Sequence, residues 1–177
     1  MIGNTGRRLG MLHLVMSLAG VWGIWTSTVA LGETVHLGMG TSRGLKYGAS
    51  LRKSTFKPLE PIRLETEFKN GSGEPVTIWL SGYWPNHQII VKDLTGNEPI
   101  LTKDGEARRR AFAPAGARDK NSPRILKSGE IYREGGVDLD RLYNLSSNRY
   151  TVQIIYQDDQ APTPLKVASE TLSFEIK

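Results

Sequence analysis

The chain contains no cysteine, and this single absence removes several kinds of site at once. Structural disulfides, thiolate zinc sites, cysteine nucleophiles and a lipid attached to an N-terminal cysteine all require that residue. A domain built from most of the 177 residues is nevertheless large enough to bury an apolar core without covalent cross-links. The composition, 38% hydrophobic and 23% charged, is that of a folded globular protein and argues against extended disorder.

Acidic residues are absent from the first 32 positions, where the chain begins with a basic and then an apolar stretch. Arg7 and Arg8 precede the run Leu9–Ala30, which is almost entirely apolar or small, and Gly32 closes the segment. This order is typical of a secretory signal peptide, so we predict that residues 1–32 are cleaved. Cleavage removes two arginines and no acid, which lowers the net charge from +5 to +3.

The same segment allows two other interpretations. Cleavage after Ala30 is one, and an uncleaved membrane anchor is the other, because Leu9–Leu31 is about long enough to span a bilayer. Three glycines and the polar triplet at 26–28 weaken it as a permanent span. We therefore expect an exported protein, periplasmic or secreted, that contacts a membrane only if this segment is retained. Small secreted domains of animals often depend on disulfides, so the lack of cysteine favours a bacterial cell envelope.

Long amphipathic helices are also missing, and the rest of the chain has the pattern of short strands and turns. Residues 33–44 are glycine-rich without a clear period, and we predict a flexible leader there. One domain is expected to occupy residues 45–177. Its clearest strand is Ile62–Lys69, in which apolar or Thr side chains alternate with charged ones. Such alternation indicates one strand face on a core and the other in water.

Turn-forming residues separate the other expected strands. Asn70–Gly73 predicts a turn that joins Ile62–Lys69 to the strand Val76–Leu80 as a hairpin. We expect Lys103–Lys127 to be irregular and Asp138–Tyr143 to form one or two helical turns. The remaining predicted strands are His87–Lys92, the edge strand Ile131–Glu134, and the final hairpin of Tyr150–Tyr156 with Glu170–Ile176. Short strands at this spacing predict an all-β fold, a single two-sheet antiparallel sandwich.

The sequence Ser-Asn-Arg-Tyr-Thr-Val at 147–152 resembles the entry to the penultimate strand of immunoglobulin-like domains. There a Gly-x-Tyr-Thr-Val pattern places a tyrosine whose hydroxyl bonds back to the preceding loop, and Tyr150 holds that position here. Asn148 replaces the glycine. With the order of the other strands, this makes residues 45–177 similar to uncharacterised exported bacterial immunoglobulin-like domains, and more distantly to the BsuPI-type proteinase inhibitor domain. The resemblance implies an immunoglobulin-like fold and no particular function.

The loop Ser81–His87 is the first candidate ligand-binding site. It gathers Tyr83, Trp84, Asn86 and His87, and aromatic rings beside amides are common on surfaces that hold sugars or peptides. The alternative is that the two aromatic rings cap the core beneath a tight turn.

Basic residues concentrate in the segment Lys103–Lys127, which holds eight positive and three negative side chains. Arg108, Arg109 and Arg110 are consecutive within it. Such a segment is able to dock an acidic polysaccharide or an anionic lipid head group, and nucleic acid is the least expected partner of an exported protein. The alternative is a solvated loop that keeps the protein soluble.

Motifs for catalysis or metal binding are lacking. His36 and His87 share no metal-ligand spacing, and no nucleophile, phosphate-loop or dinucleotide motif occurs. We therefore expect no catalytic residue, no metal site and no cofactor. The leading hypothesis is a non-enzymatic exported binding module of the cell envelope, with an envelope protein or polysaccharide as partner. The alternatives are a proteinase inhibitor that acts through Lys103–Lys127 and a structural spacer.

Overall fold

The computed structural model describes residues 36–80, 82–112, 123–158 and 165–177, and it has the all-β fold that the sequence predicts. The predicted signal peptide, residues 1–32, lies outside the described residues. No helix in the described ranges is long and apolar enough to cross a bilayer.

The two larger sheets provide most of the structure. The first has the antiparallel order β1-β2-β4-β8, with β1 (His36–Ser42), β2 (Leu45–Leu51), β4 (Arg63–Asn70) and β8 (Ile131–Asp138). The second is centred on β9, which pairs with β6 along one edge and with β10 and then β11 along the other. Its strands are β3 (Thr55–Phe56), β6 (His87–Asp93), β9 (Asn148–Asp158), β10 (Leu165–Ala168) and β11 (Leu172–Ile176).

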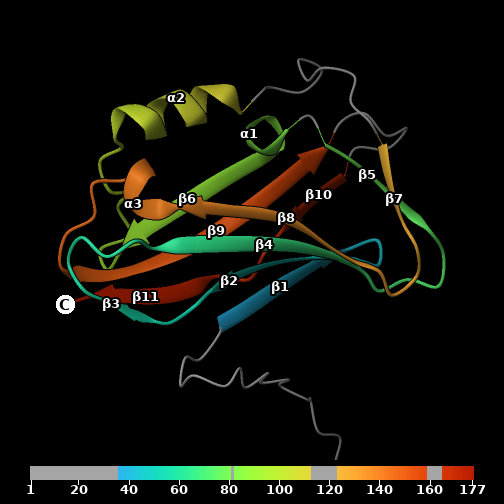
Figure 1. Cartoon of the computed structure of the whole chain (residues 1–177), viewed down its shortest axis with the longest axis horizontal. Coiled ribbons are helices and arrows are strands. Elements are labelled where there is room, and N and C mark those ends of the chain that lie inside the picture. Colours follow the sequence, from blue (N-terminus) through green and yellow to red (C-terminus); the bar gives the residue numbers. More distant parts are fainter. Residues whose placement is uncertain (1–35, 81, 113–122, 159–164) are drawn as a thin grey trace, which may run out of the picture.

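Short helices and a two-stranded ribbon complete the described chain (Figure 1). The helices α1, α2 and α3 lie along β6, and the ribbon of β5 and β7 lies at the end of the molecule away from α3. These elements are α1 (Tyr83–Asn86), α2 (Lys103–Ala111), α3 (Leu139–Leu142), β5 (Val76–Trp79) and β7 (Pro123–Leu126).

Aromatic side chains from both larger sheets meet in one core. Phe68 of β4 packs edge-on against Tyr156 of β9, with 4.8 Å between ring centroids. Tyr47 of β2 lies 4.6 Å from Phe68, and all three side chains are fully buried. The predicted alternation along β4 is confirmed, since Leu64 and Phe68 point inward while Arg63 is exposed.

The hydroxyl of Tyr150 bonds back to the preceding loop, as predicted. It donates to the carbonyl oxygen of Ser146 at 3.0 Å and accepts from the amide of the same residue at 3.1 Å. The buried ring stacks on Phe174 of β11 with 5.4 Å between centroids. The predictions of an edge strand at β8, a short helical turn at α3 and antiparallel pairing of β9 with β11 are also confirmed.

The prediction of a flexible leader over residues 33–44 is wrong for His36–Ser42, which forms β1 and pairs with β2. The two strands join through Arg43 and Gly44, both with positive φ, in the two-residue turn that suits a hairpin. Arginine is an uncommon residue in such a turn, so the sequence did not indicate a hairpin here. The glycines of β1 serve close packing, because a Cβ on Gly40 would lie 1.6 Å from the carbonyl oxygen of Ala168.

The predicted hairpin of the β4 and β5 segments is also wrong. β4 pairs with β2 and β8, whereas β5 pairs with β7 in the separate ribbon. Side chains of β9 fix the end of β5, because the amide of Trp79 donates to Tyr156 and to the buried carboxylate of Asp158. Alternation identifies which face of a strand is buried and carries no information about its pairing partner.

The segment expected to be irregular, Lys103–Lys127, contains the helix α2 and the strand β7. Thr102 caps the helix, because its hydroxyl accepts from the amide of Gly105 at 3.0 Å. Only one of the nine residues of α2 is buried, so the helix has no apolar stripe. Hydrophobic periodicity therefore did not predict it. Residues 113–122 lie outside the described ranges.

Asn70 is a fully buried polar residue at the end of β4. Its side-chain amide donates to the carbonyl oxygens of Glu74 at 2.7 Å and of Leu126 at 2.9 Å, while its oxygen accepts from the amide of Ser72. One side chain therefore joins the first sheet, the following loop and the ribbon strand β7.

We predict that Asn70→Ala lowers the free energy of unfolding by about 2 kcal/mol, because the buried carbonyl group of Leu126 loses its donor from Asn70 and that of Glu74 keeps only the hydroxyl of Ser72. Urea denaturation measures the change. The control is Asn97→Ala in an exposed turn, where the expected loss is within about 0.5 kcal/mol. Equal losses in both variants would contradict this assignment.

Candidate functional site

The turn α1 holds three of the four predicted loop residues, and His87 follows at its C-cap. The structure divides these four into two partly buried aromatic residues and two buried polar ones. Tyr83 and Trp84 are partly buried and pack against the core, as the core-capping alternative describes. Asn86 and His87 are buried, with 0% and 2% exposure. Trp84 is thus placed near the surface, while Asn86 and His87 lie beneath it.

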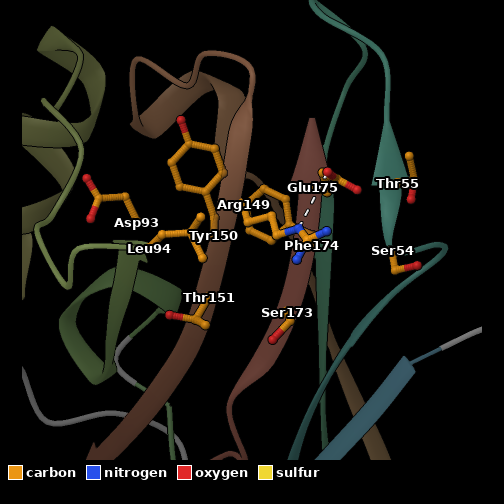
Figure 2. A pocket seen from close by; sticks show the side chains of 10 residues that line it. All are labelled: Ser54, Thr55, Asp93, Leu94, Arg149, Tyr150, Thr151, Ser173, Phe174 and Glu175. Atoms are coloured by element: carbon orange, nitrogen blue, oxygen red, sulfur yellow. Dashed lines mark ion pairs between the residues drawn. The ribbon is translucent and has the colours of Figure 1, made fainter. Parts of the chain in front are cut away.

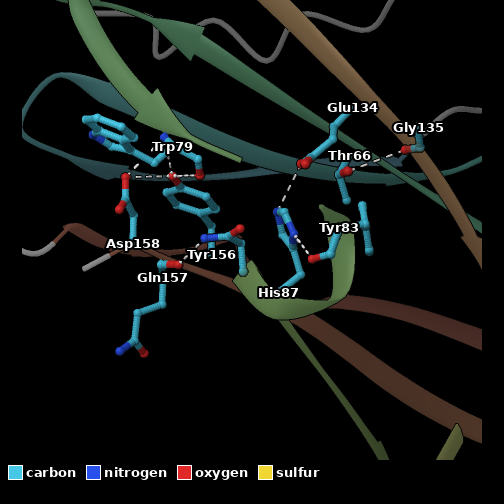
Figure 3. Close-up of polar contacts among 10 residues, drawn as sticks. Thr66, Trp79, Tyr83, His87, Glu134, Gly135, Tyr156, Gln157 and Asp158 are labelled. Atoms are coloured by element: carbon cyan, nitrogen blue, oxygen red, sulfur yellow. Dashed lines mark hydrogen bonds and ion pairs between the residues drawn. The ribbon is translucent and has the colours of Figure 1, made fainter. Parts of the chain in front are cut away.

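The two inner side chains hold the turn in place (Figure 3). The amide of Asn86 donates to the carbonyl oxygen of Gln157 on β9 at 2.9 Å. The Nδ1 atom of His87 lies 2.6 Å from the carbonyl oxygen of Tyr83, across the turn. The Nε2 atom of His87 lies 3.1 Å from the carboxylate of Glu134 on β8. These contacts tie α1 to both larger sheets.

Helix α2 brings one of the predicted arginines onto the predicted tryptophan. The guanidinium of Arg108 lies over the Trp84 ring, 5.1 Å from its centroid. The same guanidinium contacts Asp104, one turn earlier on α2, at 3.2 Å. The Tyr83 ring packs edge-on against the Trp84 ring, with 5.2 Å between their centroids. Arg108 therefore covers part of the ring that was expected to be an open platform, and presents its own charge instead.

The neighbouring arginines differ in how they are held. Arg109 pairs with Glu98, whose carboxylate also lies 3.2 Å from the hydroxyl of Tyr143. Arg110 is the most exposed of the three, 3.8 Å from Glu106. A hollow of about 50 Å³ lies beneath α2, with Trp84, Arg108, Arg109 and Tyr143 among its lining residues. This volume holds water at most, so a larger ligand would lie across the surface of the helix.

The basic segment is split between two places in the fold. Arg124 belongs to the ribbon strand β7, where its guanidinium lies 4.1 Å from the ring centroid of Tyr132 and contacts Glu130 at 3.3 Å. Arg118 and Lys120 lie outside the described residues. The residues at 103–110 and at 123–127 therefore form two separate basic surfaces rather than one loop (Figure 1).

A wider hollow of about 530 Å³ opens on the second sheet, next to β3 and the turn after β6 (Figure 2). Its polar lining includes the hydroxyls of Thr151 and Ser173 and the ion pair of Arg149 with Glu175, 3.5 Å apart. A hydrogen bond from Lys177 lowers the pKa of Glu175 below its usual range. The charged groups at the centre of this hollow are thus already paired with one another.

Glu134 is the residue of this region that sequence reasoning missed. The register between β4 and β8 shifts between Thr66 and Glu67, which face Gly135 and Arg133, and Glu134 is left without a partner. This is a β-bulge, and its carboxylate is 7% exposed. The pair of glycines that follows Glu134 in the sequence was the available signal, because a glycine within a strand often marks a bulge.

Within the described ranges, no group of three or more histidine, cysteine, aspartate or glutamate side chains is placed to hold a metal ion. Comparisons with family models, with curated proteins and with solved structures find no match to this chain.

Tyr143 supports a prediction on alkaline stability. Burial, followed by the nearby Glu98 carboxylate, raises the pKa of Tyr143 to about 12. An unfolded tyrosine ionises near pH 10, so the stability that this phenol contributes is complete below about pH 10 and is lost as the pH rises towards 12.

The unfolding free energy of the wild type should fall between pH 10 and 12. In Tyr143→Phe this fall should be less steep by up to about 1.4 kcal/mol per pH unit, because unfolding releases one fewer proton. Denaturation curves across that range measure the slope, and the offset at pH 8 reports the lost hydroxyl bonds separately. Parallel slopes for the two proteins would refute the prediction.

Proposed function

We propose that this protein is an exported, non-enzymatic binding module of the cell envelope whose ligand is an acidic polysaccharide, recognised by the arginines of α2. The observation that carries the proposal is the guanidinium of Arg108, held between the ring of Trp84 and the carboxylate of Asp104. A guanidinium fixed on both sides loses little conformational freedom when a ligand arrives.

The arginines of α2 retain capacity for an anion. Each guanidinium has five N–H donors in a planar fork, and one carboxylate contact leaves several of them open. The side chains of Arg108, Arg109 and Arg110 are 45%, 51% and 72% exposed. Carboxylates spaced along a polysaccharide match such a row of donors, and the neighbouring aromatic rings suit the apolar faces of sugars.

The inner residues of α1 support binding rather than catalysis. Histidine is a common general base, yet both ring nitrogens of His87 face oxygen atoms of the protein. A general base needs a free nitrogen within reach of a substrate proton. Asn86 and His87 are therefore assigned to the positioning of Trp84, and contact with the ligand is assigned to α2.

Two alternatives from the sequence remain as proposals with less support. A proteinase inhibitor through Lys103–Lys127 would present an exposed chain to a protease, but Arg108–Arg110 lie on a helix and not on an extended loop. A structural spacer would need no exposed arginines beside a tryptophan. The immunoglobulin-like relationship is supported by the Tyr150 hydroxyl bonds, which match the tyrosine corner of that fold.

The test measures binding of polygalacturonate oligomers, with neutral dextran as the comparison ligand, by titration calorimetry. We expect Arg108→Ala to weaken binding about tenfold, and Trp84→Ala to weaken it several-fold because the guanidinium loses its support. Affinity for the wild type should fall as salt increases.

The matched control is Arg133→Ala, which removes an arginine of β8 that is more exposed than Arg108 (78% against 45%) and leaves α2 unchanged. It should retain wild-type affinity apart from a small effect of net charge. Equal weakening by Arg133→Ala and Arg108→Ala, or equal affinity for dextran and polygalacturonate, would overturn the proposal.

A further inference from the structure

The turn between β3 and β4 holds a leucine entirely in solvent. Leu59 is 102% exposed, and its φ angle of 63° lies in the left-handed region. A bulky side chain rarely adopts that conformation, whereas glycine adopts it readily. The position therefore carries a conformational cost that no burial of the side chain offsets. An outlier of this kind on the surface is a reason to look for a function there.

Hydrogen bonds hold this turn in one conformation. The amide of Glu60 donates to the carbonyl oxygen of Lys57 at 3.1 Å, which closes a four-residue turn with Pro58 second and Leu59 third. That order is typical of a type II turn, in which the third residue is normally glycine. The carboxylate of Glu60 accepts from the amide of Lys57 at 2.9 Å and pairs with Lys53. The leucine is thus held at the tip of a well-ordered turn.

Two further aliphatic side chains are exposed at the same end of the molecule (Figure 1). Leu94 is 71% exposed in the turn after β6, and Ile100 is 77% exposed between that turn and α2. Leu94 lines the hollow on the second sheet together with Thr55 of β3, the strand that leads to Leu59. Three separate segments therefore place large apolar side chains at one end, opposite the ribbon of β5 and β7.

Backbone contacts with α3 tie these segments together. The carbonyl oxygen of Ile100 accepts from the amide of Asn144, just after α3, at 2.8 Å. At the start of α3, the amide of Leu139 donates to the carbonyl oxygen of Ile62, three residues after Leu59, at 2.9 Å. The positions of the exposed side chains are therefore set by the fold.

Basic side chains surround the tip of the Leu59 turn. Residues 52–60 include three basic residues and one acid, a net charge of +2. Lys57 is exposed beside the leucine. Lys177 lies close by, because its amide donates to the carbonyl oxygen of Phe56 at 3.0 Å. An apolar tip among cations suits an anionic lipid surface, where the tip enters the acyl boundary and the cations meet phosphates.

Acidic side chains near the tips are engaged within the protein. Glu60 pairs with a lysine of its own loop, and Glu175 pairs with Arg149 and Lys177. The carboxylate of Asp93, next to Leu94, accepts from two backbone amides of its own turn. Their repulsion of a lipid phosphate is therefore reduced.

The arrangement of the three tips favours a bilayer over a protein partner. Each tip comes from a different segment, and each is more than two-thirds exposed. Lipid molecules rearrange around separate apolar points, whereas a protein partner needs a continuous and complementary surface.

We propose that this end of the domain docks on an anionic lipid bilayer. Leu59, Leu94 and Ile100 insert at the level of the head groups, and Lys57 and Lys177 contact lipid phosphates. The folded domain makes this contact itself, without any requirement for residues 1–32. The docking goes beyond the function proposed above and does not depend on it.

The lack of cysteine allows a local test in the full chain, because one introduced thiol takes one fluorescent label. A polarity-sensitive dye is attached to Leu59→Cys, to Leu94→Cys or to the control Ile125→Cys, and vesicles of phosphatidylglycerol and phosphatidylcholine are added. Ile125 is an aliphatic residue of the ribbon, 62% exposed at the opposite end. The dye reports only its own surroundings, so attachment of the chain through residues 1–32 does not by itself change the signal at position 59.

We expect the emission at positions 59 and 94 to shift to shorter wavelength, because the dye enters a less polar environment, and the emission at 125 to stay unchanged. Vesicles of phosphatidylcholine alone should give a weaker shift, and added salt should weaken the shift on anionic vesicles. Equal shifts at 59 and 125, or equal shifts on the two kinds of vesicle, would overturn the proposal. The absence of any shift at 59 would also overturn it and would favour a protein partner for the exposed tips.

The variant Leu59→Gly separates lipid contact from folding. Glycine suits the positive φ of this position, so the urea midpoint should equal or exceed that of the wild type. With the dye at position 94, the lipid concentration for a half-maximal shift should rise about tenfold, since one leucine side chain no longer leaves water. Ile125→Gly is the matched control and should leave that concentration unchanged. An unchanged lipid requirement in Leu59→Gly would contradict the insertion of this leucine.

Discussion

The packing of aromatic rings between the two larger sheets is the interaction on which the rest of the structure depends. Phe68 touches Tyr47 within its own sheet and Tyr156 across the core, and His87 joins the same group of rings. Large rings bury much apolar area, but the hydroxyl and imidazole groups they carry need partners. The polar contacts around Trp79, Asp158 and Glu134 meet part of that need, and they determine where β5 and α1 attach.

The sequence predicts several of the strands that have one buried and one solvent-facing side, although it did not predict β10. The segment of β4 alternates cleanly and its buried face was predicted correctly, and β9 and β11 show the same alternation in the structure. The pairing of the strands was harder to predict. The sequence of β5 has the pattern expected of a hairpin partner of β4, yet side chains of β9 hold β5 in the separate ribbon with β7. The sequence did not predict β1 or α2, and the reason is the same for both. β1 is rich in glycine and α2 is rich in charged residues, so neither has a hydrophobic period. Close backbone contacts hold both elements in place.

The candidate site was predicted in its residue types and not in its geometry. Tryptophan and arginine were expected in separate loops, and the fold stacks Arg108 on Trp84. Asn86 and His87 were expected at the surface together with Trp84, yet a helical turn of four residues necessarily directs its side chains to different sides. Glu134 was not predicted as a site residue, because the regular alternation of a strand does not show where an extra residue is inserted.

The bulge in β8 also bears on how the chain tolerates changes of length. Tyr132 faces Phe68, Arg133 faces Glu67 and Gly135 faces Thr66, so the ladder is complete on both sides of Glu134. Deleting that one residue would leave β4 and β8 in an uninterrupted antiparallel register, with every other pairing as it is now. Glu134 is therefore dispensable for the sheet and removable as a unit. A strand one residue shorter would keep the same ladder and would lose the acid that reaches into the core, together with its contact to His87.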